Sequence, residues 1–255
     1  MGAVSLGLGG GAGLPARLLY QFDSYMREFD AVVTRVVGDR VFLDQTCFHP
    51  RPSGGLDADR GWLVVGGRRV GVVDVVLEGG DVAHVVEDSS VFEPGVGVHG
   101  VLDWGRRYAM MRMHTAGHVL AAVLYGRYGA RITGCFVSAD RSRFDFEIGV
   151  DDWRGAVRGA VEEANRVLSR CLEVRVYWLP REEAMRIPGI VKLADRLPPS
   201  VDRLRIVEIP GVDVQADGGP HVRNTCEVGR IELLRLESKG RRRKRLYYRV
   251  VGGGN

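Results

Sequence analysis

Short apolar runs rich in β-branched residues, separated by glycine turns, fill the chain from about Arg27 to Val101. No helical period is visible in this stretch. Gly38-Asp39 and Gly66-Gly67 lie between consecutive runs, where they indicate hairpin turns. Regularly spaced short strands of this kind predict a small antiparallel barrel or sandwich. The predicted strands are Phe29–Val37, Val41–Gln45, Gly61–Val65, Arg69–Leu77 and Val82–Val86.

Beyond residue 101 the pattern changes to a mixture of helices and strands. The segment from Tyr108 to Gly126 has an apolar stripe at helical spacing and predicts a long helix. A second helix is predicted from a cap at Asp151 to about Leu172. The second half is therefore α+β, with two main helices against an antiparallel sheet. Its other predicted elements are strands Ile132–Val137, Ser142–Ile148, Glu173–Leu179, Leu204–Ile209, Gly229–Leu236 and Leu246–Val251 and a short helix Glu182–Met185.

The two patterns divide the chain into three parts. We expect a flexible N-terminal extension over residues 1–17, a β-barrel domain over 18–100 and an α+β domain over 101–255. Hydrophobic residues make up 45% of the chain, which is enough to bury a core in each folded part.

The cysteines and the apolar residues indicate in which cellular compartment the protein lies. Cys47, Cys135, Cys171 and Cys226 are scattered without a CxxC pair, so we expect reduced thiols. The sequence contains no run of 18 uninterrupted apolar residues, so it predicts no membrane span. The glycine-rich start lacks the positive region of a signal peptide. We therefore expect a cytoplasmic protein with no membrane partner.

His114 and His118 stand four residues apart in the predicted long helix. Residues i and i+4 lie on one helix face, so the two imidazoles can converge on one metal ion. The spacing alone is equally compatible with two surface histidines that bind nothing. It therefore predicts a metal site only together with further ligands.

A third histidine, His221, follows the pair Gly218-Gly219, which lets the backbone turn tightly beside a ligand. Asp217, four residues before His221, adds a carboxylate. Three imidazoles with a carboxylate, or three protein ligands with a water, are typical of a catalytic zinc site. The alternative is a surface turn with an incidental histidine. Three of the six histidines lie in these two segments, which favours the metal site.

Four segments, in the same order, resemble the editing domain of alanyl-tRNA synthetase and its free-standing relatives, the alanyl-tRNA editing (AlaX) proteins. Leu43–Pro50 with Gly54-Gly55 is similar to the family's LDQTAFYP…GGG stretch. Asp103–His118 is similar to its WxRRYxxMRxHTAxHLL helix, and Arg143–Phe146 matches its RFDF strand. Gly218–Gly229 is similar to its CGGTHVxNTxEIG segment. Four motifs in order are far more specific than any one of them.

This resemblance implies a fold, an activity and a cofactor. It implies a translation-protein-like barrel joined to an α+β editing domain, as in the medium-length, free-standing subgroup. The implied activity is trans-editing hydrolysis of mischarged tRNA(Ala), with Ser-tRNA(Ala) and also Gly-tRNA(Ala) as substrates. Each substrate is a small amino-acid ester at the tRNA 3′ end. The implied cofactor is one Zn²⁺ ion, held in the family by HxxxH and CxxxH segments.

The chain departs from the family at the last of these segments. The family cysteine falls on Asp217, and its threonine falls on Pro220. Three ligand sets are possible at this point. Asp217 replaces the thiolate as a harder ligand, the three histidines hold the ion alone, or Cys226 contributes. We prefer these alternatives in that order. We therefore expect His114, His118, Asp217 and His221 as metal ligands. The three histidines would serve catalysis through the ion, which activates water and stabilises the oxyanion, or else only orients the substrate's amino group.

Serine differs from alanine by one hydroxyl group. A site that hydrogen-bonds a hydroxyl can reject the analogue lacking it by about 10⁴-fold or more. Thr46 in the barrel motif is our candidate for this contact, and an ordinary strand threonine is equally compatible. Arg223, Asn224 and Thr225 are further candidates for substrate binding.

A basic run near the C-terminus is the strongest candidate for tRNA contact. Its residues would grip phosphates, although a net charge of +4 does not by itself establish a nucleic-acid partner. The alternative is a solvated hairpin turn with charged flanks. The candidates are Arg241, Arg242, Arg243, Lys244 and Arg245.

Two other functions stay open at this point. The first is a zinc hydrolase acting on another small ester or amide; HxxxH lacks the glutamate that HExxH peptidases use as a base, which counts against it. The second is a non-catalytic tRNA-binding module whose metal site is lost through the change at Asp217. The zinc content of the purified protein separates the second function from the others.

Overall fold

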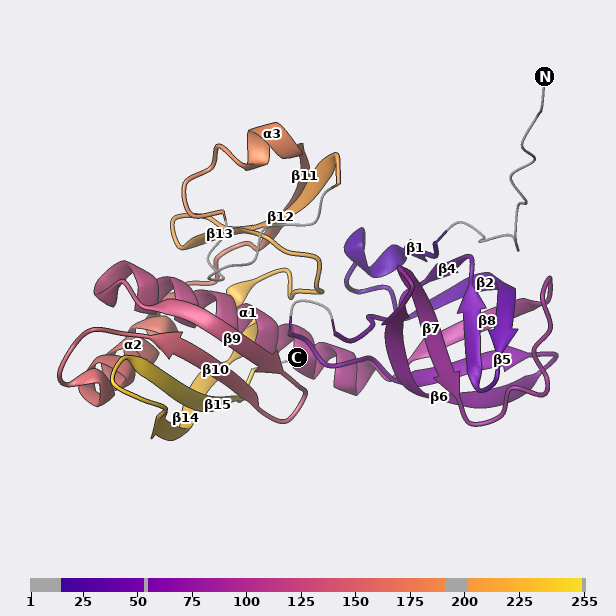
Figure 1. Ribbon diagram of the computed structural model, residues 1–255, viewed down its shortest axis with the longest axis horizontal. Helices are drawn as coiled ribbons and strands as arrows, with labels where there is room; N and C mark the ends of the chain where they lie inside the picture. Colours follow the sequence, from indigo (N-terminus) through magenta and orange to yellow (C-terminus); the bar gives the residue numbers. More distant parts are fainter. Residues whose placement is uncertain (1–14, 53–54, 191–200, 254–255) are drawn as a thin grey trace, which may run out of the picture.

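The computed structural model describes residues 15–52, 55–190 and 201–253. Within these residues a closed antiparallel β-barrel is followed by a half that contains helices and two further antiparallel sheets (Figure 1). The predicted α+β fold class is therefore confirmed. Residues 1–14 of the predicted N-terminal extension lie outside the described residues.

Six strands close the barrel, in the order β2-β3-β7-β6-β5-β8. Alternate residues face inward: in β2, Phe29, Ala31 and Val33 are buried while their neighbours are exposed. This two-residue period is the pattern from which the strands were predicted. His84, on β7, is buried inside the barrel. The strands are β2 (Glu28–Val37), β3 (Arg40–Leu43), β5 (Gly61–Val65), β6 (Arg68–Glu78), β7 (Asp81–Val86) and β8 (Gly97–Leu102).

β8 is the barrel strand that the sequence does not predict, because Gly97 and Gly100 interrupt its apolar pattern. Gly100 is needed there for space: a Cβ atom on it would lie 2.2 Å from Cε1 of Phe29. His99 lies on this strand, with Nδ1 2.8 Å from Oδ1 of Asp30. Beside the barrel are a short parallel pair and a 3-10 helix: β1 (Arg17–Leu18), η1 (Leu19–Gln21) and β4 (Gln45–Thr46).

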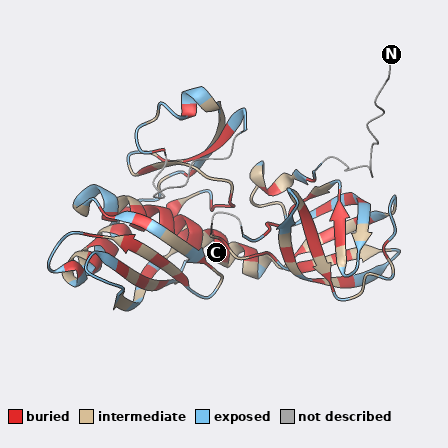
Figure 2. Ribbon diagram, viewed as in Figure 1, coloured by how far each residue is buried: buried red, intermediate tan, exposed pale blue. Residues whose placement is uncertain are grey.

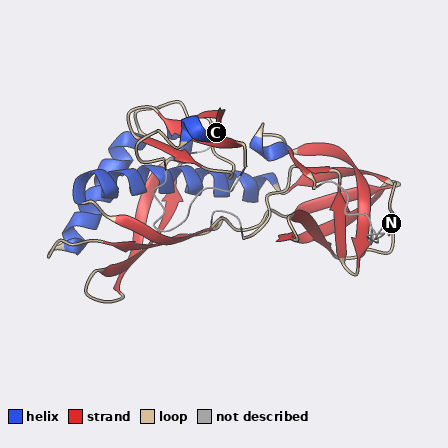
Figure 3. Ribbon diagram, turned by 45° about the horizontal axis from the view of Figure 1, so that its top comes forward, coloured by secondary structure: helices blue, strands red, loops and turns tan. Residues whose placement is uncertain are grey.

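The helix α1 (Trp104–Tyr128) is the central element of the second half (Figure 3). It begins at Asp103, whose side chain accepts a hydrogen bond from the backbone nitrogen of Arg106 at 3.1 Å. It is longer at both ends than the predicted helix. The N-terminal turn was missed because Arg107 looks polar in the sequence, although its side chain is buried.

A four-stranded sheet, in the order β14-β15-β10-β9, packs against α1 and α2 (Trp153–Leu168). Phe144 and Tyr248 are among the residues that it buries against these helices. Figure 2 shows the buried residues concentrated here and inside the barrel. Of the described helices, none combines the length and apolar character needed to cross a membrane. The strands are β9 (Arg131–Val137), β10 (Ser142–Glu147), β14 (Arg230–Ser238) and β15 (Arg243–Val251).

The helix α2 differs from its prediction at both ends. Asp152, not Asp151, is the N-cap. The helix ends at Leu168, before the predicted Leu172, because the following segment pairs with a distant part of the chain. There the backbone nitrogen of Leu172 donates to the side-chain oxygen of Thr225 at 2.9 Å.

A second, three-stranded sheet lies on the other side of α1 (Figure 1). The sequence predicts a single sheet, which is wrong. The three strands have a small core of their own, made by Ala184, Ile190, Leu204 and Ile206. The elements are β11 (Arg175–Pro180), α3 (Arg181–Ala184), β12 (Arg203–Ile209) and β13 (Asp213–Ala216).

Cys171 and Cys226 form a disulfide, so the expectation of reduced thiols is wrong for this pair. Cys47 and Cys135 are free. The bond joins the segment after α2 to the short 3-10 helix η2 (Thr225–Val228). It closes a loop with a sequence separation of 55 residues, which contains the whole three-stranded sheet.

The double variant C171S/C226S is expected to unfold with a free energy about 4 kcal/mol lower than that of the oxidised protein, because the uncross-linked loop gains freedom in the unfolded state. Urea unfolding with and without reductant measures this difference. The reduced wild-type protein should behave like the double variant. A double variant as stable as the oxidised protein would contradict a stabilising role for the disulfide.

A buried ion pair joins the barrel to α1. Nε of Arg107 lies 3.0 Å from Oδ1 of Asp59, and the two side chains are 0% and 1% exposed. Arg107 also donates to the backbone oxygen atoms of Cys47 and Ser24. The guanidinium group is thus surrounded by acceptors from three segments of the first half.

The segment from Gly55 to Asp57 makes a second junction between the two halves by pairing with β9. The backbone nitrogen of Val137 donates to the oxygen of Gly55 at 2.9 Å, and the nitrogen of Asp57 donates to the oxygen of Val137 at 2.8 Å. Leu56, between them, packs into the core of the second half. The barrel half therefore extends the edge of the four-stranded sheet.

Candidate functional site

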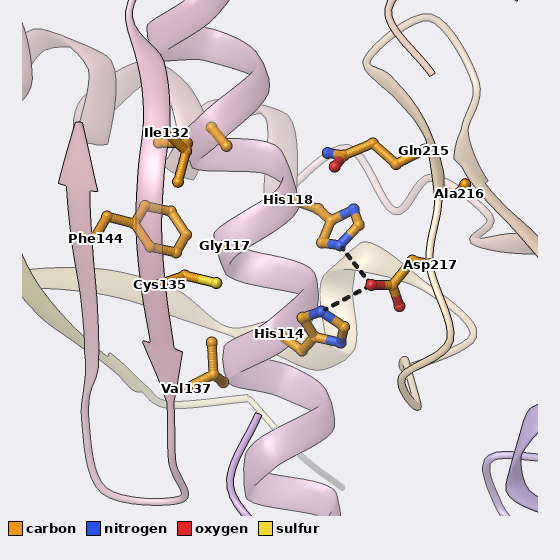
Figure 4. A pocket seen from close by; sticks show the side chains of 11 residues that line it. His114, Gly117, His118, Ile132, Cys135, Val137, Phe144, Gln215, Ala216 and Asp217 are labelled. Carbon is orange, nitrogen blue, oxygen red and sulfur yellow. Dashed lines mark ion pairs between the residues drawn. The ribbon is translucent and has the colours of Figure 1, made fainter. Parts of the chain in front are cut away.

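The middle of α1 presents His114 and His118 on one face, with ring centroids 4.9 Å apart. Both side chains are buried. The helix there packs on the four-stranded sheet with one side and faces the end of β13 with the other (Figure 4). The predicted one-turn spacing therefore places both imidazoles between the two sheets.

A tight turn after β13 brings Asp217 and His221 to the same place. Gly219 donates its backbone N–H to Oδ1 of Asp217 at 2.8 Å. The turn passes so close to α1 that a Cβ atom on Gly219 would lie 2.8 Å from Cε1 of His114. The buried Arg205 holds the turn from behind, because its Nη1 donates to the backbone oxygens of Asp217 and Gly219 at 2.9 Å each.

The four predicted ligands form one cluster, whose ligand atoms all lie within 4.8 Å of one another. Nε2 of His221 lies 3.3 Å from Oδ1 of Asp217, and Nε2 of His114 and of His118 lie 3.6 and 3.9 Å from its Oδ2. In a tetrahedron with zinc–ligand bonds of about 2.0–2.1 Å, ligand atoms lie about 3.3–3.4 Å apart. The donor set and its spacing therefore fit a single Zn²⁺ ion.

The other ring nitrogen of each histidine has a partner outside the cluster. Nδ1 of His118 lies 2.9 Å from Oδ2 of Asp213. Nδ1 of His114 lies 3.2 Å from the oxygen of Pro220, and Nδ1 of His221 lies 3.0 Å from Oγ1 of Thr115. Such outer partners fix the ring orientation of metal-binding histidines. All three Nε2 atoms consequently face the cluster.

Burial and the contacts between the ligands set their protonation. Burial lowers the pKa of His221 to about 4 and the pKa of His114 well below its usual value. Burial alone would raise the pKa of Asp217, but the imidazoles around its carboxylate outweigh this effect and hold the pKa well below its usual range. Neutral imidazoles and an ionised carboxylate are the forms that bind a metal ion.

A small cavity opens beside the cluster, between β9 and β13 (Figure 4). Its polar lining is His114, His118, Gln215 and Asp217. Its remaining lining is apolar or small and comes from α1, β9, β10 and β13: Gly117, Ala121, Ile132, Cys135, Val137, Phe144 and Ala216. The large side chains among these leave space only for a small group next to the metal ligands.

The predicted substrate-binding residues are not among those that line this cavity. Thr46 is buried beside the barrel, where its Oγ1 lies 2.8 Å from Nε2 of His84. Thr225 accepts from Leu172, and Asn224 caps η2 through the backbone nitrogen of Cys226. The side chains of all three are thus engaged in contacts within the fold.

Arg223 and Cys226 also lie away from the cluster. The guanidinium carbon of Arg223 lies 4.2 Å from the centroid of the Tyr25 ring, and its Nη2 contacts Asp23 at 3.2 Å. Cys226, the third candidate ligand in the sequence, is joined to Cys171 instead of the cluster.

The basic run spans the end of the turn between β14 and β15 and the first three residues of β15, with most of its charges engaged. Arg245 forms a two-pronged ion pair with Asp145, at 2.5 and 3.0 Å. Lys244 is buried and donates to three oxygens of the turn itself. Arg243 lies 3.6 Å from Glu147. Among the described residues, Arg241 and Arg242 have no ion-pair partner, so they are the charges of this run most open to a phosphate.

Sequence reasoning missed Asp213, Gln215 and Arg205. Asp213 and Gln215 alternate on β13, which was not predicted as a strand, so nothing indicated that both face α1. Arg205 lies in a predicted strand, but its sequence neighbours do not reveal the turn that it holds. The one available signal was the short spacing of Asp213, Gln215 and Asp217 ahead of His221.

Comparison with known proteins gives consistent matches. Residues 204–247 match the family described as "Threonyl and Alanyl tRNA synthetase second additional domain". The chain is 47% identical over 234 residues to the alanyl-tRNA editing protein AlaX-M of Saccharolobus solfataricus, covering 91% of this chain and 98% of the relative. Identity to AlaX-M of Methanosarcina barkeri is 38% over 240 residues, covering 91% and 98%. Identity to the alanine–tRNA ligase of Thermococcus kodakarensis is 39% over 223 residues, covering 87% of this chain and 24% of the ligase.

Proposed function

Because the chain belongs to the alanyl-tRNA editing protein family, we propose that it removes serine and glycine from mischarged tRNA(Ala) by zinc-dependent ester hydrolysis. It is an aminoacyl-tRNA deacylase, as the AlaX-M relatives are. The observation that supports the finer proposal most is the cluster of His114, His118, Asp217 and His221 at the wall of a small cavity. An amino-acid ester of small size fits such a cavity.

The residues of the chain have distinct roles in this proposal. The three histidines and Asp217 would hold the ion, which when bound supplies a Lewis acid and lowers the pKa of water. Asp213 holds the ring of His118, and Arg205 holds the turn that presents Asp217. The apolar lining from β9 and β10 excludes bulk water and larger side chains from the cavity.

The remaining substrate and tRNA contacts are proposals of the same kind. Asn224, Thr225 and Arg223 would act on substrate binding by fixing the segment that follows His221. Thr46 would act from the barrel side. Arg241 and Arg242, with the rest of the run to Arg245, would contact tRNA phosphates. We also propose that the chain divides near residues 17 and 100 as the sequence predicts, with the first boundary just before β1 (Arg17–Leu18) and the second just after β8 (Gly97–Leu102), so that neither strand is cut.

Deacylation of Ser-tRNA(Ala), Gly-tRNA(Ala) and Ala-tRNA(Ala) by the purified protein tests the proposal. We expect the first two to be hydrolysed well above the buffer rate, Ala-tRNA(Ala) to be spared, and a chelator to abolish turnover until Zn²⁺ is restored. The metal content of the protein is measured in parallel. Unchanged turnover in a protein that the chelator has freed of metal would exclude zinc-dependent hydrolysis.

The same assay addresses the two other functions. A protein that contains zinc but leaves all three aminoacyl-tRNAs intact would point to a hydrolase of another small ester or amide. A protein that binds tRNA(Ala) but retains no metal would be a non-catalytic module. Either outcome would remove the proposed editing of serine and glycine.

A further inference from the structure

Gln215 is the polar residue of the cavity that does not belong to the metal cluster. It lies on β13, and its side chain extends from that strand toward α1, close to the ring of His118 (Figure 4). It is partly buried. The amide group therefore lies at the wall of the cavity, next to the ligands.

The orientation of this amide follows from its partner. Nε2 of Gln215 donates to Oδ2 of Asp213 at 2.9 Å, and the same oxygen lies 2.9 Å from Nδ1 of His118. An amide nitrogen donates hydrogen bonds and an amide oxygen only accepts them, so it is the nitrogen of Gln215 that faces Asp213. The amide oxygen is then turned away from Asp213. It has no hydrogen-bond partner within the described residues.

The cavity offers few other partners to a substrate side chain. Three of its four polar residues are proposed metal ligands, and the large side chains opposite β13 are Ile132, Val137 and Phe144. Thr46 is outside the lining and already shares its hydroxyl with His84 and with the backbone nitrogen of Phe48. The Gln215 oxygen is thus the acceptor of this lining that does not belong to the proposed metal ligands, and it faces a largely apolar wall.

Resting on the proposed function, we propose that the amide oxygen of Gln215 is the specificity-determining group, which accepts serine and glycine and rejects alanine. The serine hydroxyl donates a hydrogen bond to it. Glycine has no side chain and leaves space for a water molecule to donate in the same place. The methyl group of alanine displaces that water without supplying a donor.

An acceptor that has neither water nor a donor as its partner raises the free energy of the complex. Only bound alanine leaves the acceptor in this state, so the penalty falls on alanine alone. This differs from selection by size, because alanine is smaller than serine and larger than glycine. A size limit alone cannot reject only the middle member of the series. A single acceptor that demands either a hydroxyl or a water molecule can.

The test is the variant Gln215→Met, which keeps the length of the side chain but removes the acceptor. Single-turnover rates are measured on the three aminoacyl-tRNAs, and Gly-tRNA(Ala) serves as the internal control for any loss common to all. We expect the rate ratio of serine to glycine to fall about 10- to 100-fold. The ratio of alanine to glycine should rise by a similar factor. Zinc content should equal that of the wild-type protein.

Gln215→Asn, which retracts the acceptor by one methylene group, is the second variant and should shift both ratios in the same direction. Equal loss on all three substrates, or unchanged ratios in both variants, would overturn the role of Gln215 while leaving the editing activity intact. Failure of the wild-type protein to hydrolyse Ser-tRNA(Ala) and Gly-tRNA(Ala) would overturn the proposed function, and the inference with it.

Discussion

A His118→Ala variant is expected to hydrolyse Ser-tRNA(Ala) at least roughly 10³-fold more slowly than the wild-type protein. His118 supplies one of the three imidazoles of the cluster, and Asp213 fixes its ring at 2.9 Å. Losing the proposed Zn²⁺ ion would remove several kcal/mol of transition-state stabilisation, and about 4 kcal/mol corresponds to 10³-fold. Single-turnover deacylation and the metal content of the same preparation measure the effect.

His99→Ala is the matched control for this experiment. His99 is partly exposed on the barrel strand β8 and contacts Asp30 and Glu28. Its replacement should change neither the rate nor the metal content. Wild-type turnover in the His118→Ala protein, with its metal lost, would show that hydrolysis does not depend on the metal centre.

Arg107→Met is expected to lower the free energy of unfolding by about 3–5 kcal/mol. The substitution leaves the carboxylate of Asp59 buried without its cation, and breaking one side of a buried ion pair has this order of effect. It also leaves the backbone oxygens of Cys47 and Ser24 without their donor. Chemical unfolding followed by circular dichroism measures the change.

Arg127→Gln controls for the loss of an arginine from the same helix. Arg127 contacts Glu163 in an ion pair whose arginine side chain is 51% exposed, and water replaces such a partner at little cost. Its unfolding midpoint should match that of the wild-type protein. If Arg107→Met unfolds at that midpoint too, the buried pair does not hold the barrel to α1.

Elements with a strong period could be predicted from the sequence. The alternation in β2 and the apolar face of α2 arise from burial of one side of each element, so a local window contains the information. β8 and β13 could not be found in this way. Glycines interrupt the first, and the polar residues Asp213 and Gln215 of the second face a site that is formed only in the folded chain.

The residues of the candidate site also fall into those that the sequence predicts and those that it does not. His114 and His118 are recognisable because one helical turn sets their geometry, and Asp217 and His221 because the resemblance to a known family aligns them. Arg205 holds the turn through Asp217 and Gly219, and Gln215 lines a cavity whose other walls come from α1, β9 and β10, so their sequence neighbours do not reveal either position. The disulfide had no signal either, since Cys171 and Cys226 meet only because the chain folds back after α2.

The pairing of Gly55 and Asp57 with Val137 has a consequence for the evolution and engineering of this hydrolase. Val137 lines the cavity, yet its backbone is held by a segment that precedes α1 in the chain. A graft that began at α1 would therefore lack the segment that pairs with Val137 at the cavity wall. It would also lack the acceptors of Arg107. To transfer the activity into another protein, the barrel and the α+β half must be transferred together.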